Sequence, residues 1–484
     1  MICIEAPGPT TEKKTITMSE STARAIVVAG LSGGSGKSII SVGLTAAWVR
    51  AGRKVAPFKK GPDYIDAGWL QSAAGRPCYN LDPFLFSVEA VTASFCNRSA
   101  GADLAIVEGN RGLFDGVTAR GGYSTAELAL QLDLPVLLVV NCTKMTRTVA
   151  ALVQGCITFE PKLKLAGVIL NQVATTRQEK IITEAVQHYT DTKVLGAVPR
   201  MKTDIFPMRH LGMVPYQEYD GTGEALEILA GLAREHIDMD GVESVMGMVQ
   251  AAPASNEPVK RGEQLAAPIK IGVIQDTAFQ FYYPENLEAL QRHGAELVSI
   301  NALEDERLPE LDGLYIGGGF PETSAARLAE NSSFRQSVKA AAAAGLPIYA
   351  ECGGLIYLGR EIIIDDRRYP LVGIFDVVFG MSKKPQAHGY SIFTAERDNP
   401  FYPKGFTAKG HEFRYSTIVE WHGQRQDLAL KMQRGTGFLH GYDGLVCGNV
   451  FALYTHLHAE GTPEWAQHFT RKSIQYKNDR RLGS

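Results

Sequence analysis

Two stretches of this chain carry residue types and spacings that could do chemistry. The first is residues 26–38, IVVAGLSGGSGKS, a run of β-branched residues that breaks into glycines and closes on Lys37 and Ser38. A strand, a turn with inward-facing N–H groups and a helix N-terminus together cradle phosphate oxygens. The common P-loop has its first glycine at the position of Leu31, whereas this chain has Gly30. The stretch therefore predicts a variant nucleotide-binding loop, with a plain glycine-rich turn as the alternative.

The second stretch is residues 347–355, PIYAECGGL, in which a short apolar strand runs into Cys352. A nucleophile on a tight strand-to-helix turn is exposed, and the N–H that follows it can face an oxyanion. A catalytic thiol also needs a base from elsewhere in the fold, and the strand-like run 450–458 ends in two candidates, His456 and His458. Either histidine could instead be a hydrogen-bonded structural residue. We expect five other cysteines to be buried core residues: Cys78, Cys96, Cys142, Cys156 and Cys447.

The elements around the first stretch have the rhythm of βαβ units. Continuous apolar runs predict strands, and apolar residues at helical spacing predict helices. Strands that alternate with helices imply a parallel sheet covered on both faces, with ligands at the carboxyl ends of the strands. The predicted strands are 26–29, 54–58, 104–107, 135–140 and 166–170, and the clearest helices are 38–51 and 147–157.

Polar residues follow three of these strands. They are Lys59, Asp63 and Asp66, then Glu108 and Asp115, and finally Asn171. Oxygens of Glu108, Ser38 and an aspartate such as Asp63 suit a magnesium ion. The alternative is a set of solvated loop charges that cap helices.

The length of 484 residues predicts more than one domain. A second α/β series begins with a strand at 269–274, followed by the aromatic residues 281–283, which we expect at an interface or a substrate surface. The predicted division is a disordered leader at 1–22, a first domain at 23–245, a linker at 246–268, a second domain at 269–475 and a basic tail at 476–484.

Composition narrows the class of protein. The hydrophobic content of 45% and charged content of 21% are typical of a soluble globular protein. A formal net charge of -3 gives no reason to expect nucleic acid or an anionic membrane as partner. The seven scattered cysteines form no CxxC pair, which favours a reducing cytoplasm over a disulfide framework or a zinc site. No apolar run reaches the roughly 18 residues of a spanning helix.

Together these features resemble the cobyrinate a,c-diamide synthase family, glutamine-dependent amidoligases joined to a class I glutamine amidotransferase domain. The resemblance runs from about residue 23 to residue 460 in the family's order. Its motifs are AGLSGGSGKS, PFKKGPDYIDAGW, NLDPF, EGNRGLFDG, GVILNQV and RHLGMVP in the first half, and IGVIQDTAFQFYYPENLEAL, GLYIGGGFPE, AECGGLIYLG, GHEFRYS and YTHLH in the second. The resemblance also accounts for the glycine spacing, since related dethiobiotin-synthetase-like enzymes have the P-loop Gly-x3-Gly-x-Gly-Lys-Ser/Thr.

The resemblance implies a P-loop domain that uses ATP and magnesium to phosphorylate a corrin carboxylate, and a second α/β domain that hydrolyses glutamine for ammonia. The expected reaction is amidation of the a and c acetate groups of cobyrinic acid in cobalamin biosynthesis, by a cytoplasmic homodimer. By resemblance, ATP would be held by Gly34, Ser35, Gly36, Lys37, Ser38 and Asn171, and Mg²⁺ by Ser38, Asp63 and Glu108. The corrinoid carboxylate would meet the γ-phosphate beside Lys59, Asp66 and Asp115. Cys352 would be the glutaminase nucleophile, His456 its base, and Gly319 and Gly353 the oxyanion donors.

Two departures from the expected patterns stand out. Class I amidotransferases commonly have Glu two residues after the catalytic His, where this chain has His458, so the third triad member is missing or replaced. Asn141 stands where relatives often carry Asp, which would leave more of the metal binding to Glu108 and Asp63.

Three alternative functions differ from this one in substrate or in class of protein. One alternative is the same chemistry on hydrogenobyrinate or a nickel sirohydrochlorin. Another is a cobyric acid synthase, but the motifs FKKGPDYID and GLFDG favour the a,c-diamide synthase family. The third is a partitioning-type switch ATPase, which would carry a second lysine near the start of the P-loop, where this chain has Gly30, Leu31 and Ser32. Such an ATPase would also have no use for Cys352 with His456.

Overall fold

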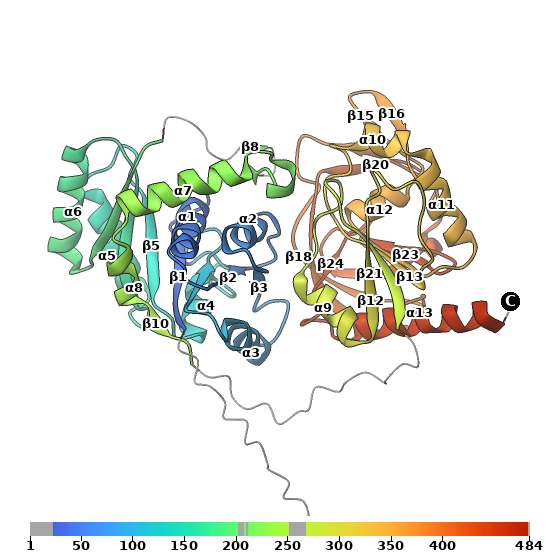
Figure 1. Ribbon diagram of the computed structural model, residues 1–484, viewed down its shortest axis with the longest axis horizontal. Helices are drawn as coiled ribbons and strands as arrows, with labels where there is room; N and C mark the ends of the chain where they lie inside the picture. The colour runs from blue at the N-terminus through green and yellow to red at the C-terminus, as the bar shows by residue number, and fades with distance from the viewer. Residues whose placement is uncertain (1–22, 202–207, 210–211, 251–267, 483–484) are drawn as a thin grey trace, which may run out of the picture.

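The computed structural model describes residues 23–201, 208–209, 212–250 and 268–482. Figure 1 shows two α/β lobes side by side, the first ending near residue 250 and the second beginning at residue 268. The leader predicted at 1–22 and most of the predicted linker, 251–267, lie outside the described residues. Within the described ranges, no helix has the length and apolar character needed to cross a membrane.

The N-terminal lobe is built on one eight-stranded sheet in the order β3-β2-β4-β1-β5-β6-β7, with β10 paired to β1. All neighbours along the main path are parallel, and β10 is antiparallel. Its strands are β1 (Arg24–Gly30), β2 (Val55–Lys60), β3 (Tyr79–Leu81), β4 (Leu104–Glu108), β5 (Val136–Asn141), β6 (Leu165–Val173), β7 (Val194–Pro199) and β10 (Gly247–Met248). A small hairpin pairs β8 (Met208–Arg209) with β9 (Gly212–Met213).

Helices cover both faces of this sheet. Side chains alternate along a strand, so Val27 of β1 belongs to one core and Val28 to the other. Helices α1 (Lys37–Arg50), α2 (Ile65–Ala74) and α7 (Thr222–His236) pack on the Val28 side, and α8 (Met239–Val245) contributes there too. The Val27 side is covered by α3 (Val88–Ser99), α4 (Thr125–Gln131), α5 (Thr148–Phe159) and α6 (Thr176–Thr190). The doubly covered parallel sheet predicted from the sequence is confirmed.

The C-terminal lobe has a ten-stranded mixed sheet in the order β12-β11-β13-β14-β23-β22-β21-β18-β19-β24. Pairing is parallel from β12 to β23 and antiparallel beyond it. Its strands are β11 (Ile269–Ile274), β12 (Ala295–Ile300), β13 (Gly313–Ile316), β14 (Ile348–Glu351), β18 (Ala387–Ala395), β19 (Thr407–Arg414), β21 (Leu428–Arg434), β22 (Tyr442–Cys447), β23 (Val450–Leu453) and β24 (His456–Leu457).

A four-stranded sheet and five helices complete this lobe in its described part. The smaller sheet has the order β16-β15-β17-β20. Its strands are β15 (Glu361–Ile364), β16 (Arg367–Pro370), β17 (Val377–Met381) and β20 (Ser416–Trp421), and the helices are α9 (Pro284–Arg292), α10 (Ala325–Glu330), α11 (Ser332–Ala343), α12 (Gly353–Leu358) and α13 (Glu464–Leu482).

Three predicted boundaries differ from the structure. The linker expected from residue 246 starts later, because Gly247–Met248 forms β10 against β1. The tail expected from residue 476 is the last part of α13, where Lys477 Nζ lies 3.3 Å from a carboxylate oxygen of Asp312. The strand-like run 450–458 is split, because β23 pairs with β14 whereas β24 pairs with β19.

The two lobes contact each other through side chains of β3, α3, β18 and α9. Tyr79 Oη donates to Glu288 Oε1 at 2.8 Å, and Arg98 Nη1 lies 2.8 Å from Glu288 Oε2. From the other side, Tyr390 Oη donates to Asp82 Oδ2 at 3.0 Å. The labels β18 and α9 stand on the side of the C-terminal lobe that faces the N-terminal lobe in Figure 1. These contacts bring the carboxyl ends of the N-terminal strands toward the second lobe.

Candidate functional site

The glycine-rich turn joins β1 to α1 as the sequence predicts. Gly36 has a φ of 94°, and a Cβ there would lie 2.0 Å from Asn171 Nδ2. Only glycine fits, because a side chain would be strained and would also collide with that amide. Asn171 is 2% exposed and its Nδ2 donates to Ser35 O at 2.9 Å. Asn171 therefore supports the loop from below, while its expected contact with adenine stays a prediction.

The ammonium of Lys37 is held by backbone carbonyls. Its Nζ donates to Ser32 O at 3.0 Å and to Arg111 O at 2.7 Å. Burial lowers the pKa of Lys37, and the nearby charge of Lys59 lowers it further. Phosphate oxygens would be stronger acceptors than these carbonyls, because a charged partner roughly doubles the strength of a hydrogen bond.

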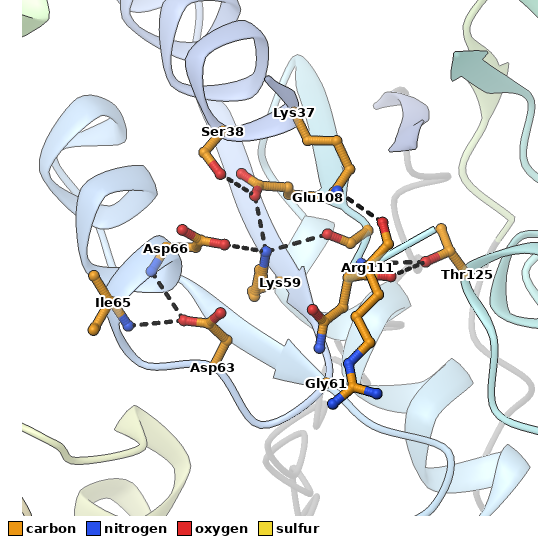
Figure 2. Close-up of polar contacts among 12 residues, drawn as sticks. Lys37, Ser38, Lys59, Gly61, Asp63, Ile65, Asp66, Glu108, Arg111 and Thr125 are labelled. Carbon is orange, nitrogen blue, oxygen red and sulfur yellow. Dashed lines mark hydrogen bonds and ion pairs between the residues drawn. The ribbon is translucent and has the colours of Figure 1, made fainter. Parts of the chain in front are cut away.

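Lys59 lies at the centre of a buried polar cluster behind the loop (Figure 2). Its Nζ donates to Asp66 Oδ2 at 2.6 Å, to Glu108 Oε1 at 2.8 Å and to Gly109 O at 3.1 Å. Burial disfavours the charge, but the two carboxylates outweigh burial and raise the pKa of Lys59 above its ordinary value. Lys59 is 1% exposed, so its ammonium is enclosed by Asp66, Glu108 and the Gly109 carbonyl.

Glu108 at the end of β4 has the oxygens that a hard cation requires. Burial raises its pKa to about 7, and Ser38 Oγ donates to its Oε1 at 2.8 Å. Its Oε2 is buried and has no hydrogen-bond partner within the described chain. No group of three or more His, Cys, Asp or Glu suited to a metal occurs among the described residues. Mg²⁺ usually takes one or two carboxylates together with phosphates and waters, so Ser38 and Glu108 fit it.

The three predicted aspartates occupy different positions. Asp63 Oδ1 accepts from the N–H groups of Ile65 at 2.9 Å and Asp66 at 3.0 Å, at the start of α2. Asp115 is exposed, and its Oδ2 accepts from Gly112 N at 2.8 Å. Asp63 and Asp115 thus shape loops, and Asp66 alone is paired with Lys59.

Cys352 lies on a strained turn between β14 and α12. Its φ of 47° and ψ of -97° are rare for a residue with a side chain, and such strain collects at active sites. The two predicted oxyanion donors lie together, since a Cβ on Gly353 would be 2.9 Å from Gly319 N. A side chain at Gly319 would meet Ala278 O at 2.1 Å, so glycine is required there.

His456 is placed to act as the base of Cys352. Burial alone would lower its pKa, but the neighbouring Cys352 side chain and the Glu351 carboxylate outweigh burial and raise the pKa of His456 to about 10. Its Nδ1 lies 3.4 Å from Glu351 Oε2, and both side chains are at most 3% exposed. Glu351 Oε2 also accepts from Tyr315 Oη at 3.2 Å, and its Oε1 accepts from Leu457 N at 3.3 Å. Cys352, His456 and Glu351 form a triad-like arrangement.

His458 has a different environment. Its Nε2 lies 3.6 Å from Glu285 Oε2, and its Nδ1 accepts from Glu460 N at 3.2 Å. Its ring stacks on Phe86 of the N-terminal lobe, with centroids 4.8 Å apart. His458 thus packs at the lobe interface, the structural alternative considered above.

Tyr64 connects the two predicted sites. It precedes α2 in the N-terminal lobe, and its ring lies 5.1 Å from that of Phe281 and 5.4 Å from that of His456. It also packs on Tyr283 and His411 of the C-terminal lobe, at 4.5 and 5.6 Å. The aromatic segment 281–283 therefore contributes to the interface between the lobes.

One cavity of about 520 Å³ joins the two sites. Its lining from the N-terminal lobe includes Asp63, Tyr64, Asp66 and Asp115, and its lining from the C-terminal lobe includes Gly319, Cys352 and His456. Apart from Tyr64, the sequence predicted these residues but not that they share a space. Glu351 and Tyr64 were missed as functional residues. A carboxylate directly before the nucleophile was the available signal for Glu351, whereas nothing local marked Tyr64.

Comparison with known proteins agrees with this architecture. Residues 26–211 match the CobQ/CobB/MinD/ParA nucleotide binding domain family, and residues 270–464 match the CobB/CobQ-like glutamine amidotransferase domain family. The cobyrinate a,c-diamide synthase of Magnetococcus marinus is 42% identical over 445 residues, 90% of this chain and 94% of that protein. Those of Dehalococcoides mccartyi and Archaeoglobus fulgidus are 39% and 37% identical, each covering 93% of this chain and 98% of the relative.

A nucleotide-binding domain joined to a glutamine amidotransferase domain with a Cys–His pair defines a glutamine-dependent ligase. Its relatives match about nine-tenths of its length, and the chain belongs to the cobyrinate a,c-diamide synthase family. The resemblance and the fold class expected from the sequence are confirmed.

Proposed function

We propose that this enzyme amidates the a and c acetate carboxylates of cobyrinic acid, using ATP, Mg²⁺ and ammonia released from glutamine. The observation that carries the proposal is the single cavity lined both by Cys352 and His456 and by Asp66 and Asp115. A glutaminase site and a carboxylate-activating site that share a cavity can pass ammonia from one to the other. The names of the relatives support cobyrinate as the substrate.

A carboxylate reacts poorly with ammonia, because oxide is a very poor leaving group. Transfer of the γ-phosphoryl group of ATP to a carboxylate oxygen gives an acyl phosphate, from which ammonia displaces phosphate. Catalysis of such a transfer consists mainly of positioning and charge stabilisation. Lys37 and the N–H groups of the loop would bind the phosphates. Ser38 and Glu108, together with Asp63, would hold Mg²⁺, which when bound would supply positive charge against the phosphate.

The C-terminal site releases the ammonia. The Cys352 thiolate attacks the side-chain amide carbon of glutamine, and the oxyanion accepts hydrogen bonds from the N–H groups of Gly353 and Gly319. His456 takes the thiol proton and gives it to the departing ammonia, and water then hydrolyses the thioester to glutamate. The Glu351 carboxylate, whose Oε2 lies 3.4 Å from His456 Nδ1, orients the ring and stabilises the imidazolium.

Ammonia must reach the acyl phosphate in its neutral form, since ammonium is not a nucleophile. The rings of Tyr64 and His411 lie beside that of His456, with centroids 5.4 and 4.9 Å away, and Phe281 stacks on Tyr64. Burial lowers the pKa of His411 well below its usual range, and the charge of His456 lowers it further, so His411 is neutral. Tyr64, Phe281 and His411 are therefore uncharged and do not protonate ammonia as it leaves Cys352.

Phosphate release from ATP tests the substrate assignment. With glutamine present, the rate should depend on added cobyrinic acid and should be much slower with hydrogenobyrinic acid or nickel sirohydrochlorin. A rate independent of any tetrapyrrole would contradict the proposal, and a faster rate with another tetrapyrrole would reassign the substrate.

A further inference from the structure

The cavity between the lobes has a basic end that the chemistry above does not use. Lys60, the last residue of β2, lines this end and is 5% exposed. Strand alternation directs Lys59 and Lys60 to opposite faces of β2. Lys59 is paired with two carboxylates, whereas no hydrogen bond or ion pair reaches Lys60 Nζ within the described part of the chain. The Lys60 side chain is buried apart from its contact with the cavity, so an anion in the cavity would stabilise its ammonium.

Asp82 lies within electrostatic reach of Lys60 without forming an ion pair with it. Its Oδ1 accepts from Phe84 N at 2.8 Å and Leu85 N at 3.2 Å, and its Oδ2 accepts from Tyr390 Oη at 3.0 Å. Burial lowers the pKa of Lys60, and the positive charges of Lys59 and Arg111 lower it further. The negative charge of Asp82 raises it but does not offset these effects. Asp82 is therefore committed to holding the loop and the lobe interface together.

Two exposed arginines belong to the basic end, one from each lobe, whereas a third lining arginine, Arg414, is buried and donates to Ser416 O and Gly437 O. Arg111 is exposed with a φ of 51°, and its Nη2 lies 2.6 Å from His388 Nε2 across the interface. Burial and the Arg111 charge lower the pKa of His388, so this histidine is a neutral acceptor and leaves the guanidinium charge uncompensated. Arg434 at the end of β21 is exposed and also lines the cavity. Bidentate binding of carboxylates is the usual role of such guanidinium groups.

Five acidic residues line the cavity; four of them are engaged as follows, and the fifth, Glu322, also has an interaction of its own. Asp66 is paired with Lys59, Asp63 and Asp115 accept backbone N–H groups, and Glu412 accepts from Thr436 N and Gly437 N at 3.1 Å. Aromatic rings accompany the basic residues instead. Tyr390 stacks on Phe84 with centroids 4.1 Å apart, and Tyr123 meets Phe84 edge-on at 5.5 Å.

We propose that Lys60, Arg111 and Arg434 form a subsite for carboxylates of the macrocyclic substrate that do not react in the current turnover, with Tyr390 and Tyr123 against its flat ring. The inference rests on the proposed function and deepens it. A flat macrocycle fringed with carboxylates needs fixed cations beside an aromatic surface. Because the cations come from both lobes, the substrate binds across the interface and turns one acetate toward Asp66 and Asp115.

Direct binding of cobyrinic acid, without ATP or glutamine, tests the subsite by calorimetry. Lys60→Met and Arg434→Met should each weaken binding about 10- to 100-fold, the usual loss for one charge-assisted hydrogen bond. The affinity of these two variants for the fully methyl-esterified macrocycle should differ from the wild-type affinity by less than threefold. Lys431→Met is the matched control, because Lys431 lies on the same strand as Arg434 but outside the cavity lining, and it should bind cobyrinic acid as the wild type does.

Glutaminase activity reports whether each variant is folded, and the exposed Arg434 provides a substitution that leaves the core intact. Wild-type affinity in folded Lys60→Met and Arg434→Met would overturn the subsite, and so would equal losses for the acid and its ester. In either case cobyrinate-dependent phosphate release by the wild type would leave the proposed function standing. A wild type that neither binds nor turns over cobyrinic acid would overturn both.

Discussion

Replacing Glu351 by Gln tests whether its carboxylate orients His456. Glutamine keeps the size of the side chain and can still accept from Leu457 N, so packing next to Cys352 is retained. The change removes the negative charge that lies 3.4 Å from His456 Nδ1. In a serine protease triad, an amide in place of the carboxylate costs about 10⁴-fold in kcat. The contact here is longer than an ideal hydrogen bond and a thiol needs less help than a hydroxyl, so we expect a loss of about 10²- to 10³-fold.

The pH profile of glutamine hydrolysis separates orientation from a merely structural role. His456 must keep its proton in order to give it to ammonia. The raised pKa of about 10 means that the wild type loses this proton, and with it activity, only as the pH rises toward that value. Without the Glu351 charge the pKa of His456 falls, so the basic limb of the Glu351→Gln profile should move to lower pH. The neighbouring His411 is neutral in this range, since its pKa is well below the ordinary value.

Ammonia-driven amidation is the internal control, because it does not use Cys352 and should proceed at the wild-type rate in Glu351→Gln. Glu285→Gln is the matched variant, since Glu285 lies beside His458 and not His456. It should keep both the hydrolysis rate and the basic limb. Wild-type kcat with an unmoved basic limb in Glu351→Gln would refute the orienting role. A parallel fall in ammonia-driven amidation would show a general structural defect instead.

Two more predictions concern the other lobe and the interface. Glu108→Gln should lower ATP-dependent turnover about 10²-fold or more and leave glutamine hydrolysis intact, because in the proposed site the buried carboxylate would hold Mg²⁺. Near-normal turnover at ordinary magnesium would remove Glu108 from the proposed metal site. Tyr64→Ala should raise the ratio of glutamate released to amide formed, because the ring packs between the two sites at 5.4 Å from His456; an unchanged ratio would mean that Tyr64 does not couple them.

Local sequence pattern was sufficient for the P-loop and for the nucleophile turn. In both, glycines and an apolar strand within a dozen residues determine the backbone, so Gly36 and Cys352 could be placed without tertiary information. The strand ends were also predictable, because parallel strands bring Lys59, Glu108 and Asn171 to one edge of the sheet. That rule predicts which edge of the sheet these side chains share, but not which of them form ion pairs. Only the structure shows that Lys59 is buried between Asp66 and Glu108.

Contacts between distant segments were not predictable. Residues 450–458 alternate like one strand, but pairing of His456 with β19 instead of β14 ends the strand at Leu453. The third triad member was expected two residues after His456, and because His458 stands there it was taken as missing or replaced, although Glu351 approaches His456 from β14. The packing of Tyr64 against the C-terminal lobe depends on how the two lobes meet. No sequence pattern within either lobe predicts this arrangement.

The most direct test of the central claim, that ammonia made at Cys352 serves the carboxylate site, compares two nitrogen sources in Cys352→Ser. Amide formation on cobyrinic acid is measured with glutamine and then with ammonium at a pH where free ammonia is abundant. We expect Cys352→Ser to form no amide with glutamine. With ammonium it should form the amide at the wild-type rate. If Cys352→Ser still forms the amide with glutamine, or fails to form it with ammonium, Cys352 is not the source of ammonia for the carboxylate site.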